Sequence, residues 1–355
     1  MANSIQVMRM CQAFADAGHD VTLFGRPGVH DGDVFDYYGV RRVFEIATCT
    51  PRKNGRVREW RYAVAVKREL SNAPPFDLVY GRHLPSVALA ARNGIPFIYE
   101  SHQPASRTGR LVERILFRRR NMVRTVFISE ALRQAYRNRF SWLPKERTLV
   151  AHDGAPVSAH ETTTGRDVSS GGRLNIGYTG SLQSGRGIDL IASLAARLPH
   201  HEFQICGGSP EEEQRCRRVY SDLRNVHIHG FRKPSEMWSW QRSMDILVAP
   251  YQCSVPTVDW MSPLKIFEYM ASGIPIVASD LPVLREVLTH DKTALLVSPD
   301  NIDGWSAAVE RLQDGFLRNR LALRALEECQ VKFRWRLRAK NVLESFMTSE
   351  KTAAA

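Results

Sequence analysis

Two cationic side chains in the second half of the sequence stand where a phosphate-bearing ligand could reach them. Arg186 lies in the segment SLQSGRG, directly after an apolar run that predicts a buried strand. Lys265 lies near the start of a predicted amphipathic helix. Gly180, Gly185 and Gly187 would let the backbone approach a ligand closely, and helix starts attract anions. These residue types suit a phosphate-bearing ligand, and the alternative for Arg186 is an exposed arginine in an ordinary turn between a strand and a helix.

The predicted helix around Lys265 also carries a carboxylate. Ser262 and Pro263 are typical of a helix cap and first turn, and Gly273 is typical of a helix end. Lys265 and Glu268 are three residues apart, so they share a face near the positive end of the helix dipole. This face suits a phosphorylated, polyhydroxylated ligand. The alternative is a surface ion pair worth roughly 0.2–0.5 kcal/mol.

In the first half, the segment YESHQP follows another buried-strand pattern and places Glu100 and His102 at the end of that strand. His102 is either structural or a site residue. Glu100 is a candidate for substrate binding or for pairing with Arg82 or His83. The Asp-Gly-Asp at 31–33 lies in a polar loop and predicts a plain turn, so the sequence indicates no metal site.

Short β-branched apolar runs alternate with amphipathic segments along the whole chain. This is a βαβ pattern repeated twice, and it predicts an α/β protein with two doubly wound parallel sheets. The predicted strands lie in residues 20–24, 76–80, 96–100, 125–129 and 148–152, and in 174–180, 202–206, 225–230, 244–250, 274–279 and 293–297. The Ser/Thr/Gly-rich residues 157–173 lack periodicity and predict the linker between two domains.

The two phosphate-site segments resemble motifs of a known family. Residues 178–191, YTGSLQSGRGIDLI, and residues 262–287, beginning SPLKIFEYM, resemble the donor-site motifs of the group 1 glycosyltransferases, a retaining family with the GT-B fold. The resemblance implies two Rossmann-like domains that face each other across a cleft. Residues 1–160 would form the acceptor-side domain and residues 170–334 the nucleotide-sugar domain. A last helix at about 335–350 would cross back onto the first domain.

The resemblance also assigns roles to individual residues. It implies catalytic roles for His102, Arg186 and Lys265, and an acceptor side formed by Glu100 and His102. It implies no metal and no cofactor, since the nucleotide sugar is a substrate. The implied donor-binding residues are Gly180, Ser181, Arg186, Met261, Ser262, Lys265 and Glu268.

Two departures from the family pattern stand out. Glu268 matches the second glutamate of an E-x7-E motif, but the first glutamate position falls on Trp260, with Asp259 adjacent. The chain also opens directly on a helical pattern that ends near Gly18, without the strand and Gly-rich loop that precede it in the family. Either the start is assigned too far downstream, or the protein is truncated and neighbouring strands are left unpaired.

Composition narrows the class of protein and its partners. A hydrophobic fraction of 43% and a charged fraction of 24% are typical of a globular protein, and six scattered cysteines fit a reducing cytoplasm. The net charge of +12 calls for an acidic partner, and no nucleic-acid-binding motif is visible. Residues 107–124 predict a basic amphipathic helix suited to an anionic membrane surface, the alternative being a core-facing stripe with solvated arginines. Its apolar stripe is Leu111, Val112, Ile115 and Leu116, and its arginines are Arg107, Arg110, Arg114, Arg118, Arg119, Arg120 and Arg124.

We therefore expect a cytoplasmic enzyme, peripheral at the inner face of the cell membrane. It would move a sugar from a UDP- or GDP-sugar to a glycan or lipid-linked acceptor in surface polysaccharide biosynthesis, with retention of configuration. Two alternatives stay open: a GT-B nucleotide-sugar epimerase, and a non-catalytic nucleotide-sugar-binding subunit.

Overall fold

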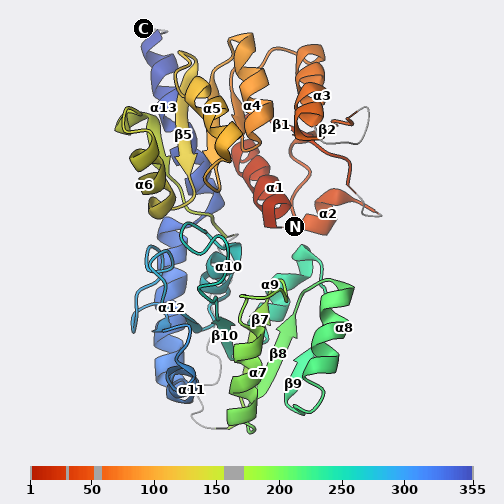
Figure 1. The fold of residues 1–355 in the computed structure, drawn as a ribbon, viewed down its shortest axis with the longest axis vertical. Helices are drawn as coiled ribbons and strands as arrows, with labels where there is room; N and C mark the ends of the chain where they lie inside the picture. The colour runs from red at the N-terminus through yellow and green to blue at the C-terminus, as the bar shows by residue number, and fades with distance from the viewer. Residues whose placement is uncertain (1, 29–31, 52–57, 156–171, 354–355) are drawn as a thin grey trace.

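The structure is a computed structural model that describes residues 2–28, 32–51, 58–155 and 172–353. The described chain forms two lobes stacked end to end (Figure 1). The upper lobe contains α1 to α6, and the lower lobe contains α7 to α12. The last helix, α13, returns to the upper lobe. No helix among these residues is both long and apolar enough to cross a bilayer.

The upper lobe is built on parallel strands in two separate sheets. β1 pairs with β2, and the other sheet has the order β3-β4-β5-β6. Within the described residues, β1 and β3 are not paired with each other. The strands are β1 Thr22–Gly25, β2 Glu45–Thr48, β3 Val79–Gly81, β4 Phe97–Ser101, β5 Met122–Phe127 and β6 Thr148–Val150. The helices are α1 Ala2–Ala15, α2 Val34–Tyr38, α3 Arg58–Asn72, α4 Leu84–Ala90, α5 Arg107–Leu116 and α6 Glu130–Arg139, with short 3-10 turns at Ala91–Asn93 and Lys145–Arg147.

The lower lobe is one six-stranded parallel sheet of order β12-β11-β10-β7-β8-β9. The strand order reverses between β7 and β10, which lie side by side. The strands are β7 Asn175–Thr179, β8 Glu202–Cys206, β9 Val226–Ile228, β10 Ile246–Ala249, β11 Ile276–Ser279 and β12 Leu295–Val297. The helices are α7 Ile188–Arg197, α8 Pro210–Val219, α9 Pro234–Arg242, α10 Leu264–Ser272, α11 Ile302–Arg311 and α12 Gly315–Lys332. This is the doubly wound arrangement, and it confirms the predicted fold class.

Helix α13, Trp335–Ala353, packs on the upper lobe although it follows the lower lobe in sequence. Its apolar side chains join those of α1 and of the β4–β6 sheet in one buried cluster. Arg124 of β5 donates to the Asn341 carbonyl at 2.9 Å, and Ala155 forms a β-bridge with Arg334. The domain boundaries at 160 and 170 lie in or beside residues that the structure does not describe, so they stay a prediction.

Most elements form where the apolar pattern predicts them. Each predicted strand run overlaps an observed strand. β10 and β11 are buried throughout, and a parallel strand buried on both faces needs a continuous apolar run. The predicted helix end at Gly273 is confirmed by a φ of 68°. The predicted cap at Ser262 is wrong. The helix begins at Leu264 after Pro263, and the Ser262 hydroxyl instead accepts from the Asp153 backbone N–H at 3.1 Å.

Candidate active site

The two predicted phosphate-binding cations lie together at the carboxyl ends of β7 and β10. Arg186 comes from the turn that follows β7, and Lys265 comes from the first turn of α10. Both stand against the ring of Tyr251, which follows β10. The Arg186 guanidinium carbon is 5.6 Å from the ring centroid, and Lys265 Nζ is 5.1 Å from it. In open α/β sheets, ligands bind outside the strand ends where the strand order reverses, which is this place.

The backbone of Gly180 leaves room for the lysine. A Cβ at residue 180 would stand 2.9 Å from Lys265 Nζ, and φ there is 138°, a conformation that suits glycine. Lys265 Nζ also lies 3.8 Å from the centroid of the Tyr178 ring, a cation–π contact. Next to it, the Ser181 carbonyl accepts from the Tyr178 hydroxyl at 2.7 Å.

Lys265 forms no ion pair with a carboxylate within the described residues. Burial, with the Arg186 charge as a second cause, holds its pKa well below the ordinary value. Glu268 opposes that shift only partly. A diphosphate placed against the two cations would supply the missing negative charge.

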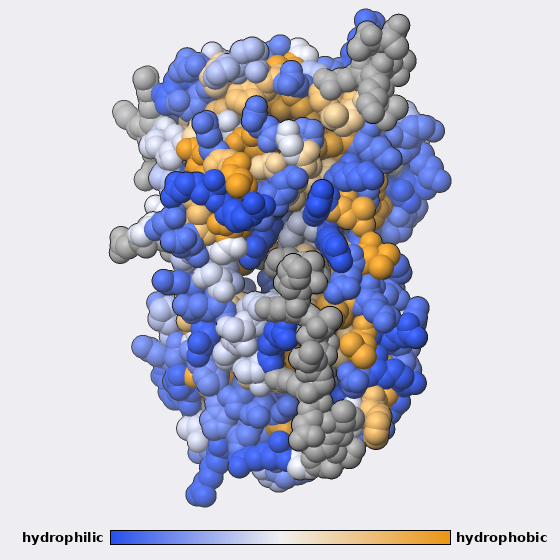
Figure 2. Space-filling model, turned by 180° about the vertical axis from the view of Figure 1, so that it is seen from behind, coloured by the Kyte–Doolittle hydropathy of each residue, from blue (hydrophilic) through white to orange (hydrophobic). Residues whose placement is uncertain are grey.

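Glu268 faces a pocket between the lobes. Arg9, Trp238, Gln241 and Trp335 help to line this pocket, so both lobes contribute. Gln241 Nε2 donates to the Glu268 carboxylate at 3.4 Å, and burial raises the Glu268 pKa. From behind, the molecule is hollowed between its upper and lower halves (Figure 2).

Residues 260–262 differ from what the sequence predicts. The Met261 side chain is buried, and its N–H donates to the Thr257 carbonyl at 2.8 Å, so this N–H is not free for a ligand. Trp260, at the position of the absent first glutamate, packs against the apolar cluster of the upper lobe, and its carbonyl accepts from Ser129 at 2.9 Å. Asp259 is exposed. An aromatic contact between the lobes therefore occupies the carboxylate's position.

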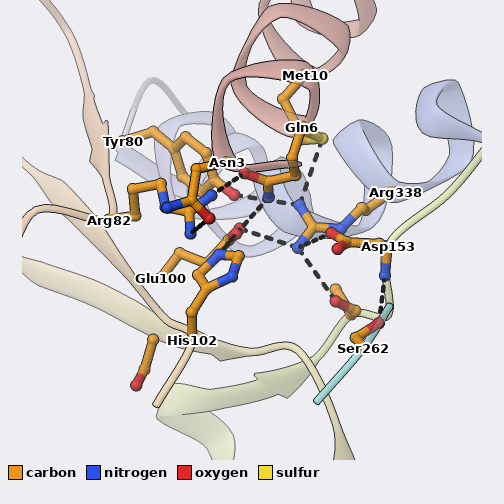
Figure 3. A network of polar contacts seen from close by, with 12 residues as sticks. Asn3, Gln6, Met10, Tyr80, Arg82, Glu100, His102, Asp153, Ser262 and Arg338 are labelled. Atoms are coloured by element: carbon orange, nitrogen blue, oxygen red, sulfur yellow. Dashed lines mark hydrogen bonds and ion pairs between the residues drawn. The ribbon is translucent and has the colours of Figure 1, made fainter. Parts of the chain in front are cut away.

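On the upper lobe, Glu100 and His102 belong to a buried polar network (Figure 3). His102 Nε2 lies 2.5 Å from Glu100 Oε1, and the other carboxylate oxygen pairs with Arg338 of α13 at 2.9 Å. Gln6 of α1 also donates to Glu100. The Arg338 charge, followed by His102, outweighs burial and lowers the Glu100 pKa to about 2.

This network corrects the prediction for Glu100. The side chain is 1% exposed and its oxygens are engaged, so it does not reach an acceptor. The predicted partners are also wrong: His83 contacts Glu59 and Ser86, and Arg82 contacts Gln6 and Asn3. His102, with 20% of its side chain exposed, is the member that can meet a substrate. The sequence missed Arg338 because it lies 238 positions from Glu100.

Backbone contacts tie the two lobes together beside these groups. The Glu286 carboxylate of the lower lobe accepts from the N–H groups of Glu130 and Ala131 at the start of α6, at 2.7 and 2.9 Å. The Asp153 N–H donates to Ser262, three residues before Lys265. These contacts connect the upper lobe, which carries His102, to the lower lobe, which carries Arg186 and Lys265.

One group of described residues has metal-ligand spacing, formed by His200, His201 and Glu310. His200 and His201 precede β8, at the amino end of that strand and so at the opposite edge from Lys265, and Glu310 comes from α11. The Leu174 N–H donates to His201 Nδ1, so the proton of the neutral ring sits on Nε2, the atom that faces Glu310.

Of the Asp-Gly-Asp segment, Asp31 lies outside the described residues. Asp33 caps α2 and pairs with Arg42, as a turn residue does.

Comparisons with known proteins identify the family to which this chain belongs. Residues 173–314 match the family described as "Glycosyl transferases group 1", and residues 4–158 match "Glycosyltransferase Family 4". A phosphatidyl-myo-inositol mannosyltransferase from Mycolicibacterium smegmatis is 25% identical over 361 residues, covering 96% of this chain and 89% of the relative. An O-antigen chain mannosyltransferase, RfbU, from Salmonella typhimurium is 36% identical over 63 residues, 18% of this chain and 17% of the relative.

Solved structures share the fold. Sucrose-phosphate synthase from Thermosynechococcus elongatus superimposes with a TM-score of 0.72 at 18% identity, covering 100% of this chain and 94% of that one. HepE from Anabaena, in complex with UDP and glucose, gives a TM-score of 0.70 at 18% identity, covering 96% and 95%. The fold and the family matches define a GT-B glycosyltransferase that transfers sugars from nucleotide-sugar donors. The chain belongs to the group 1 glycosyltransferases.

Proposed function

We propose that this enzyme is a retaining glycosyltransferase that moves a sugar from a UDP- or GDP-sugar to a lipid-linked glycan acceptor, in surface polysaccharide or glycolipid assembly. The observation that carries the proposal is the pair Arg186 and Lys265 around the Tyr251 ring, neither of which forms an ion pair with a carboxylate among the described residues. The relatives support the acceptor class, since one is named for phosphatidyl-myo-inositol and another for the O-antigen chain.

In the proposed reaction, the acceptor hydroxyl oxygen bonds to the anomeric carbon on the face that the diphosphate leaves. The bond between that carbon and the phosphate oxygen breaks, and the departing phosphate takes the hydroxyl proton. Arg186 and Lys265 stabilise the charge that develops on the diphosphate. Glu268 accepts hydrogen bonds from the nucleoside, and His102 contacts the sugar.

We place the acceptor at an anionic membrane surface that α5 contacts. The predicted single apolar stripe is wrong: Leu116 is buried in the core, whereas Leu111 and Ile115 are each 64% exposed. Exposed arginines flank these two side chains, and Arg118 stacks on the partly exposed Trp142 ring at 4.4 Å. Apolar groups flanked by arginines and a tryptophan suit a lipid interface. Arg124 does not belong to this surface, since it lies in β5 and donates to α13.

A thermal-shift comparison of UDP, GDP and ADP tests the donor class, with stabilisation by UDP or GDP alone as the expected result. Donor consumption is then measured with and without a lipid-linked glycan fraction. A transferase consumes donor only with the acceptor present. An epimerase turns over donor without the acceptor, and a binding subunit consumes none, so either result would refute the proposal.

A further inference from the structure

Glu100 and Arg338 form a buried ion pair, and the Glu100 carboxylate also contacts His102. Glu100 is 1% exposed and Arg338 is 4% exposed. Charges this deeply buried are costly to desolvate, and they are stable only when geometry and hydrogen bonding are nearly complete. The pair is connected to a side chain that is not deeply buried, and that side chain is the candidate substrate contact.

Arg338 is itself fixed by groups from several elements. Its Nε donates to the His152 carbonyl at 2.9 Å, and one Nη donates to the Ala151 carbonyl at 3.1 Å. The other Nη contacts the Tyr80 hydroxyl at 3.2 Å. These contacts use the planar fork of the guanidinium, which a lysine could not reproduce. The arginine therefore holds the Glu100 carboxylate in one orientation (Figure 3).

The contact with Glu100 decides where the proton of His102 sits. An ionised carboxylate only accepts hydrogen bonds, so the ring nitrogen that faces it, Nε2, carries a hydrogen. In the neutral ring, Nδ1 then keeps its lone pair and accepts a hydrogen bond from a hydroxyl group. Both the ring orientation and the tautomer follow from a carboxylate that is out of reach of solvent.

We propose that Glu100 and Arg338 are positioning residues for His102, which present its Nδ1 as the acceptor for a hydroxyl of the reacting sugars. Helix α13 follows the lower lobe in sequence, yet through Arg338 it completes the histidine side of the site. This inference rests on the proposed transferase function, and it adds two residues that do not touch substrate.

The alternative is a purely structural role, in which the pair only holds α13 on the upper lobe. A double variant, Glu100→Gln with Arg338→Met, separates the two roles. It removes both charges of the pair at once, and an uncharged replacement of a buried pair often leaves folding intact. The buried Asp153 carboxyl, 4.0 Å from Arg338, is unchanged in this variant. The matched control is Arg124→Met, which removes another contact between the upper sheet and α13 but does not touch His102.

Each variant is assayed for kcat and KM of sugar transfer and for the thermal shift caused by UDP. For the double variant we expect kcat to fall about 10- to 100-fold while the UDP shift is kept, and for the control we expect wild-type kcat. The same double substitution in a His102→Ala background should change kcat by less than about twofold, because its effect acts through that ring. If the double variant does not fold, Arg338→Lys replaces it, with the same fall in kcat and the same kept UDP shift expected.

Wild-type kcat in the folded double variant would overturn the inference, as would an equal fall in the His102→Ala background. An equal fall in the control would assign the effect to α13 docking. The wild-type protein is assayed first, so that a failure of the proposed function is recognised separately, by an absence of transfer before any variant is made.

Discussion

The charged groups of the two lobes are organised in opposite ways. In the upper lobe, Glu100 and Arg338 are buried against each other, and the side-chain nitrogen and oxygen atoms of both residues are hydrogen-bonded. In the lower lobe, Arg186 and Lys265 stand side by side against aromatic rings, with no carboxylate paired to Lys265 in the described chain. The first arrangement is complete without a ligand, whereas the second is completed by an anion. Stability should therefore depend on the upper group and donor affinity on the lower one.

The single variant Arg338→Met should have the largest effect on stability. It leaves the Glu100 carboxylate buried without its cation, and breaking a buried pair from one side typically costs 3–5 kcal/mol, so we expect about that loss in the free energy of unfolding. Urea unfolding measures it. Glu100 has a lowered pKa, so the pair's contribution is present above the ordinary carboxyl pKa and is lost as pH falls toward about 2. The difference between wild type and variant should therefore shrink in acid, and a difference that does not change with pH would contradict this account.

The second prediction concerns the lower lobe. Arg186→Ala and Lys265→Ala should each weaken UDP or GDP binding by about 10- to 150-fold, the equivalent of roughly 1.5–3 kcal/mol for a charge-assisted hydrogen bond. Neither should lower the melting temperature, because neither cation forms an ion pair among the described residues. Isothermal titration measures the affinity. Arg285→Ala is the control, since Arg285 is an exposed arginine of the same lobe that pairs with Asp280. Equal affinity losses in all three variants would indicate a general charge effect.

The contrast also explains which residues the sequence could reveal. Arg186 and Lys265 were found because their positions are set locally, by a glycine-rich turn after a strand and by a helix start. β10 and β11 are predicted correctly because burial on both faces leaves a continuous apolar run. β2 was missed because its residues, EIAT, are partly exposed and not continuously apolar.

The upper network could not be predicted in the same way. Arg338 meets Glu100 only after the chain has crossed to the lower lobe and returned, and no local pattern records such a contact. Met261 is an implied donor-binding residue, yet its backbone N–H donates to the Thr257 carbonyl within the turn. Likewise, Trp260 marks a departure from the family motif in sequence, but only the fold shows that its ring packs against the other lobe.

The third prediction concerns the pH dependence of donor binding through Lys265. Burial and Arg186 lower the pKa of Lys265, and only the protonated ammonium attracts a diphosphate. Donor affinity should therefore fall as pH rises through that lowered pKa, below the range where a free lysine titrates. Lys265→Arg keeps its charge throughout, so the pH dependence of UDP affinity should flatten in this variant. The same slope in both proteins would show that another group titrates.

The smallest expected effect on stability belongs to α5, a region outside both charged groups. Leu111 and Ile115 each expose 64% of their surface, so replacing both with serine should change the free energy of unfolding by no more than about 0.5 kcal/mol. The same change should weaken binding to vesicles of phosphatidylglycerol and phosphatidylcholine by about tenfold or more, since each apolar side chain loses its transfer into lipid. Sedimentation with vesicles measures this binding. The matched control is Leu323→Ser, a partly exposed leucine on α12 of the other lobe. If the double serine variant binds as the wild type does, the arginines alone hold the protein at the surface, and raising the salt concentration should then release it.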